Sequence, residues 1–168
     1  MEVNYDLLRG KINNHFNVMD KSLEFLFEHK YIIKENGNTK VGKTLKKDYR
    51  DVQAVRITLV DIYNSIENII KEILKQYEQL PGESEFHKEL IENASIETNY
   101  RLALISDNTR EDLDGFRSFS HVLNKKYGIN LKNDIIESLL TKVVNVCEAF
   151  NNDIKEFLTN MERIQNEQ

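Results

Sequence analysis

The stretch LDGFRSFSHVLNKKYGINL, residues 113–131, decides the fold because its side chains separate into two faces when placed on a helix. With about 100° between successive residues, the apolar side chains gather on one side and a polar face lies opposite. We therefore expect an amphipathic helix that packs its apolar face on other helices, points its polar face away from them, and ends near Gly128. The apolar face holds Phe116, Phe119, Val122 and Leu123, and the polar face holds Arg117, Ser120, His121 and Asn124, with Lys125 at its border.

The composition favours a single helical domain over residues 1–168. The chain is 40% hydrophobic and 30% charged, with one proline and six glycines, which suits long helices better than a turn-rich β fold. Its net charge of −5 gives no global attraction to nucleic acid, so any RNA contact would need a local basic patch. The N-terminus lacks the features of a signal peptide, no apolar run is long enough to span a membrane, and the lone Cys147 suits the cytoplasm.

Apolar residues recur at three- and four-residue steps along most of the chain, which indicates helices. Near the start, Asn36-Gly37 could close a short hairpin between residues 31–33 and Val41, although a loop fits equally well. Late in the chain, apolar residues alternate in steps of four and three from Ile136 to Met161, as in left-handed bundles. We predict an all-α, up-and-down bundle of about five helices, at residues 3–29, 44–79, 85–105, 108–126 and from about 131 onward.

Residues 37–44, GNTKVGKT, match the phosphate-loop pattern of nucleotide-binding proteins. That loop needs a strand before it and a parallel sheet around it, and the sequence offers no later strands. We therefore interpret the match as chance. The same region carries the densest basic cluster, which could contact RNA or an acidic partner but suits a solvated helix start better. The cluster holds Lys40, Lys43, Lys46, Lys47 and Arg50.

From about residue 59 to 161 the chain resembles the HepT-like HEPN proteins, the toxin half of a bacterial and archaeal toxin–antitoxin pair. The resemblance rests on four fragments that occur in the family's order within a helical chain of suitable length. It implies a HEPN-type bundle and a homodimer in which the helix at residues 108–126 lies near the two-fold axis. The fragments are LVDIYNSIENIIKEI (59–73), FHKELI (86–91), YRLALIS (100–106) and RSFSHVLNKKYGINL (117–131).

The family cuts RNA without metal through an Arg and a His separated by four residues, followed after one intervening residue by a Tyr. The resemblance places these positions at Ser120, Lys125 and Tyr127, so only the tyrosine is kept. A histidine can take a proton from a ribose hydroxyl, and an arginine can hold the phosphate as charge builds. Ser120 carries no charge, and the pKa of Lys125 would have to fall from about 10 to about 7 before it could act as a base.

Neighbouring residues offer two further interpretations. Arg117 and His121 share a helix face and could replace the lost pair together with Lys125, although a displacement of one turn is large for proton transfer. Tyr127 could be the residue to which a nucleotidyltransferase antitoxin attaches AMP, as the resemblance implies, or a half-buried aromatic beside Gly128. His87, which follows Phe86 at a helix start, is expected to make a structural hydrogen bond.

Three functions follow. The first is a HepT-like toxin-family protein of a toxin–antitoxin or defence system, with a degenerate ribonuclease centre, that acts by binding RNA or a partner such as a nucleotidyltransferase-type antitoxin. The second is an active metal-independent endoribonuclease that uses Arg117, His121 and Lys125. The third is a helical adaptor with no nucleic-acid role. No spacing of His, Cys or acidic residues indicates a metal site, and we expect no cofactor.

Overall fold

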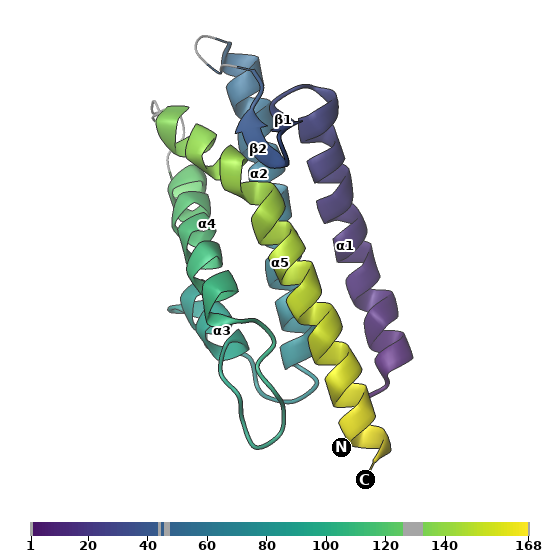
Figure 1. The fold of residues 1–168 in the computed structure, drawn as a ribbon. Coiled ribbons are helices and arrows are strands. Elements are labelled where there is room, and N and C mark those ends of the chain that lie inside the picture. Colours follow the sequence, from purple (N-terminus) through teal and green to yellow (C-terminus); the bar gives the residue numbers. More distant parts are fainter. Residues whose placement is uncertain (1, 44, 46–47, 126–132, 168) are drawn as a thin grey trace.

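In the computed structural model the chain folds into long helices that lie side by side (Figure 1). Residues 2–43, 45, 48–125 and 133–167 are described, with the backbone alone for residues 121–125 and 133. The all-α class and the predicted hairpin are both confirmed. The elements are α1 (Tyr5–Glu28), β1 (Ile32–Glu35), β2 (Asn38–Val41), α2 (Tyr49–Leu74), α3 (Phe86–Ala94), α4 (Asp107–Lys125) and α5 (Asn133–Asn166).

The helices α1, α2 and α5 form the long body of the bundle, and α3 and α4 cover its other side (Figure 1). The apolar series on α5 is buried as its spacing predicts, from Ile136 at 0% exposure to Met161 at 7%. Cys147 lies in this series, and burial raises the pKa of its thiol to about 12, as expected of a packed cysteine. Within the described part of the chain, no helix is both long and apolar enough to traverse a bilayer.

The residues that match the start of the phosphate-loop pattern form part of a β-hairpin. Strands β1 and β2 pair antiparallel from Ile32↔Val41 to Glu35↔Asn38, and Asn36 and Gly37 form the turn with φ of 51° and 79°. Two positive φ values in succession are typical of the turn that Asn-Gly favours. The first glycine of the pattern is therefore a hairpin residue, and the four residues after it form a strand, so the chance interpretation is confirmed for residues 37–41.

The hairpin is fastened to the start of α2. Tyr31 donates its hydroxyl to Asp51 Oδ1 at 2.6 Å, and Lys43 Nζ lies 2.6 Å from Asp51 Oδ2. Burial and this acceptor raise the pKa of Tyr31 to about 12, while Lys43 and Tyr31 hold the pKa of Asp51 below its usual value. Lys40 pairs with Glu35. In the predicted basic cluster, these two lysines are therefore already engaged with carboxylates, and Lys46 and Lys47 lie outside the described residues.

Gly42 allows the close approach at the base of the hairpin. A Cβ added there would lie 2.5 Å from Lys30 O and 2.8 Å from Ile33 Cγ2. We expect Gly42→Ala to lower the free energy of unfolding by about 1–3 kcal/mol, because the backbone must move to admit the methyl group. The matched control is Gly10→Ala on α1, where a Cβ meets nothing within 4 Å. It should raise stability by about 0.5–1 kcal/mol. Urea unfolding measures both, and equal effects would contradict the prediction.

Three predicted helix ends are wrong. The second helix spans Tyr49–Leu74 rather than 44–79, because Asp48 caps its start and short-range turns follow Leu74. The third stops at Ala94 instead of reaching residue 105, since Leu104 and Ile105 donate their N–H groups back to Ala94 O at 2.7 and 3.2 Å.

Arg101 organises the connection that replaces the lost part of this helix. Its guanidinium is 1% exposed and donates to the backbone carbonyls of Asn93, Ile96 and Leu102 as well as to Glu78. The helix predicted at residues 108–126 also begins one residue earlier than expected. Ser106 Oγ accepts from Thr109 N at 3.3 Å, and α4 begins at Asp107.

Candidate functional site

The polar face predicted for α4 does not all point away from the bundle. The apolar side behaves as expected, with Phe116 and Phe119 at 3% and 6% exposure. On the polar side, however, Arg117 is half-buried and Ser120 is 5% exposed. The prediction of a polar face directed away from the bundle is therefore wrong at Ser120. The physical reason is that α4 packs against α2 and α3 as well as α5, so two of its sides are covered.

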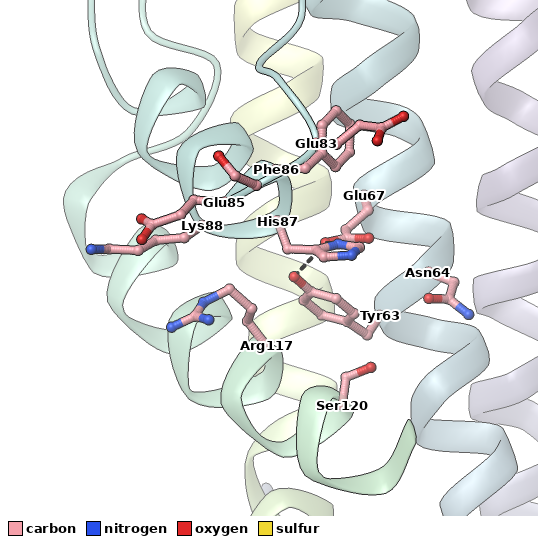
Figure 2. A pocket seen from close by; sticks show the side chains of 11 residues that line it. Tyr63, Asn64, Glu67, Glu83, Glu85, Phe86, His87, Lys88, Arg117 and Ser120 are labelled. Carbon is pink, nitrogen blue, oxygen red and sulfur yellow. Dashed lines mark hydrogen bonds and ion pairs between the residues drawn. The ribbon is translucent and has the colours of Figure 1, made fainter. Parts of the chain in front are cut away.

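Ser120 instead faces a pocket of about 300 Å³ between α2, α3 and α4 (Figure 2). Two of the predicted site residues, Arg117 and Ser120, line it from α4. The segment that leads into α3 supplies the rim, and α2 supplies the opposite wall. The lining residues are Tyr63, Asn64, Glu67, Glu83, Ser84, Glu85, Phe86, His87, Lys88, Arg117 and Ser120.

A buried carboxylate connects the walls of this pocket. Glu67, which is 3% exposed, accepts at Oε1 from the Tyr63 hydroxyl at 2.6 Å and pairs through the same oxygen with His87 Nδ1 at 2.7 Å (Figure 2). Tyr63 and Glu67 are four residues apart on α2, so their side chains share a face. The predicted structural hydrogen bond of His87 is confirmed, and it joins α3 to α2.

The burial of Tyr63 and the charge of Glu67 both change the pKa of the Tyr63 hydroxyl. Burial raises the pKa of the Tyr63 hydroxyl most, and the negative charge and hydrogen bond of Glu67 raise it further, while Arg117 opposes them. Tyr63 therefore stays protonated and acts as a donor. His87 has a side chain that is 60% exposed, and its Nε2 makes no hydrogen bond with a described residue.

The basic side chains around the pocket are engaged with carboxylates. Arg117 Nε donates to Asp114 Oδ1 at 2.7 Å, and Lys88 Nζ lies 3.8 Å from Glu92 Oε1. Glu67, Glu83 and Glu85 add three carboxylates to the lining. The pocket is thus polar and acidic on balance, which does not suit a phosphate. In the part of the chain that is described, no three acidic, His or Cys residues are grouped so as to hold a metal ion.

Of the other predicted site residues, His121 and Lys125 belong to the last two turns of α4, where the backbone alone is described. Tyr127, like Gly128, lies outside the described residues. Sequence reasoning did not predict that Tyr63, Glu67 and His87 meet in one site. The spacing of Tyr63 and Glu67 was a usable signal, whereas the approach of α3 depends on the tertiary fold.

A model of the HepT-like protein family matches residues 54–161, which is more than half of the chain. The chain belongs to the HepT-like family. The match begins within α2 and ends within α5, so every residue of the pocket belongs to the HepT-like region, whereas α1 and the hairpin precede it. Neither the curated proteins nor the solved structures gave a match.

The Tyr63 hydroxyl should stabilise this HepT-like fold. We expect Tyr63→Phe to lower the free energy of unfolding by about 1.5–3 kcal/mol, because Glu67 loses a buried donor. The wild type should also lose stability above about pH 10, where an unfolded tyrosine ionises but the folded one, with its raised pKa, does not. Urea unfolding at pH 7 and at about pH 10.5, roughly half a unit above the ordinary pKa of tyrosine, measures both effects. If Tyr63→Phe lost as much stability between the two pH values as the wild type does, Tyr63 would not be the source of the alkaline loss.

Proposed function

We propose that this HepT-like protein serves a toxin–antitoxin or defence system as a partner-binding member whose family ribonuclease centre is degenerate. The observation that carries the proposal is the identity of residue 120. The position at which the family resemblance expects an arginine lies in the pocket as an uncharged serine. Without a guanidinium there, the pocket lacks the group that would hold a phosphate as its negative charge grows.

Arg117 does not make up for this loss. Its guanidinium already donates to Asp114, and the carboxylates of Glu67, Glu83 and Glu85 share its pocket. Like charges in the lining repel a phosphodiester, and the whole chain carries a net charge of −5. A protein partner is therefore favoured over RNA as the binding target.

The assembly follows from the family resemblance. We propose a homodimer with α4 near the two-fold axis, a nucleotidyltransferase-type antitoxin as the partner, and Tyr127 as the residue that such an antitoxin would modify. The active endoribonuclease built on Arg117, His121 and Lys125 and the plain helical adaptor are the alternatives. The engagement of Arg117 with Asp114 counts against the first of these.

An RNA-cleavage assay tests the proposal. Purified protein is incubated with labelled single-stranded RNA in the presence of a chelator, and the products are resolved by length. We expect the wild type to leave the RNA intact. Cleavage that disappears in His121→Ala would overturn the proposal in favour of the shifted ribonuclease centre.

A further inference from the structure

We propose that the pocket between α2, α3 and α4 binds an arginine side chain of a protein partner, whose guanidinium pairs with the buried carboxylate of Glu67. This inference rests on the proposed function, because it names the chemistry by which the partner is recognised. Three features of the described residues carry it: an incompletely partnered carboxylate, a serine hydroxyl that opens on the pocket, and the charge of the lining.

The carboxylate of Glu67 has hydrogen-bond acceptor sites that no described residue uses. Both of its hydrogen-bond partners, Tyr63 and His87, use Oε1, and Oε2 makes no hydrogen bond with a described residue. A carboxylate offers about four acceptor sites, and a buried one gains most from a cationic donor. Within the described ranges, no lysine or arginine pairs with Glu67, and His87 provides a charge only when it is protonated. The carboxylate of Glu67 is thus buried without a lysine or arginine in direct ion-pair contact, although Arg117 and Lys88 line the same pocket.

Ser120 supplies the second feature. The residue is 5% exposed, it lines the pocket, and its hydroxyl makes no hydrogen bond with the described part of the chain (Figure 2). The hydroxyl group opens on the pocket rather than being sealed in the core, so it is available to accept a hydrogen bond from a ligand that enters. Where the family resemblance expects a long arginine, the short serine leaves space for a side chain that enters from outside.

The charge of the lining selects a cation. Glu83 and Glu85 flank the entrance before α3, and with Glu67 they outnumber the two cations of the lining. Of these cations, Arg117 pairs with Asp114 at 2.7 Å, whereas Lys88 has a long, exposed pair with Glu92 at 3.8 Å. An arginine fits better than a lysine, because its planar fork offers several N–H donors to the polar groups of the lining, whereas a lysine offers one compact charge. The aromatic ring of Tyr63, which also lines the pocket, gives a surface on which a guanidinium can lie, whereas Lys71 Nζ already lies over the Phe86 ring at 5.1 Å.

The test uses N-acetyl-arginine methylamide as the probe and records backbone amide signals of α2 and α3 by NMR. We expect saturable shifts with a dissociation constant on the order of 1 mM. Glu67→Gln, which keeps the shape of the side chain, should weaken binding by about tenfold or more. The matched control Glu83→Gln, at the exposed rim, should change it by less than about twofold.

Ser120→Arg gives a second, independent readout. The new guanidinium should occupy the pocket, abolish binding of the probe and raise the melting temperature, whereas Ser120→Ala, which loses one hydrogen bond, should weaken binding by about two- to tenfold without abolishing it. Shifts that do not saturate, or that persist unchanged in Glu67→Gln, would overturn the arginine pocket. The arginine pocket would also be overturned if inorganic phosphate, and not the arginine probe, shifted the same amide signals of α2 and α3. If the probe fails while RNA stays intact, the arginine pocket alone is wrong, whereas RNA cleavage by the wild type refutes the proposed function.

Discussion

Replacing Ser120 by arginine and Lys125 by histidine together should give a protein that cuts RNA without metal, at least about 100-fold above the background left by the wild type. The arginine would return a guanidinium to the pocket, where Glu67 can orient it through one edge. The remaining N–H donors of the guanidinium stay available for a phosphate. The histidine would return a base whose ordinary pKa lies near neutrality.

The two single variants separate these contributions. Ser120→Arg alone should bind RNA more tightly with little cleavage, because Lys125 stays protonated at its ordinary pKa. Lys125→His alone should remain inactive, since nothing stabilises the charge on the phosphate. The measurements are cleavage of labelled RNA in a chelator and growth arrest on expression in bacteria. A folded double variant that shows neither would refute the assignment of residues 120 and 125 to the family positions.

The local parts of the fold could be predicted from the sequence. Apolar spacing identified α5 and its buried series, and Asn36-Gly37 identified the hairpin turn because two successive positive φ values favour that pair. Such features depend on residues that are neighbours in the chain. The end of α3 could not be predicted in this way. It is determined by Arg101, whose partners Glu78 and Asn93 lie 23 and 8 residues away.

The pocket could not be predicted either, because it too depends on residues that are distant in the sequence. A helical wheel assigns Ser120 to a polar side but cannot tell that α2 and α3 cover that side. In the sequence, Tyr63 and Glu67 belong to one family-like fragment and His87 to another. What joins them is one carboxylate oxygen, which accepts from two helices at once. Contacts of this kind become visible only when the packing is known.

Arg101→Ala should be strongly destabilising, lowering the free energy of unfolding by about 3–5 kcal/mol. The Arg101 side chain is 1% exposed, and its loss would leave three backbone carbonyls and Glu78 without their cationic donor. Unsatisfied buried acceptors each carry a large cost. Urea unfolding at pH 7 measures the loss, with the slope of the transition checked for two-state behaviour.

Arg110→Ala is the matched control, because Arg110 lies at the start of α4 with a 33% exposed side chain and ion pairs no shorter than 3.6 Å. Exposed pairs contribute little, so its loss should cost about 1 kcal/mol or less. Limited proteolysis adds a local test. In Arg101→Ala, cleavage should begin between residues 95 and 106, because the guanidinium holds that connection against α3. Equal destabilisation by the two substitutions, or first cleavage elsewhere, would show that Arg101 does not organise the end of α3.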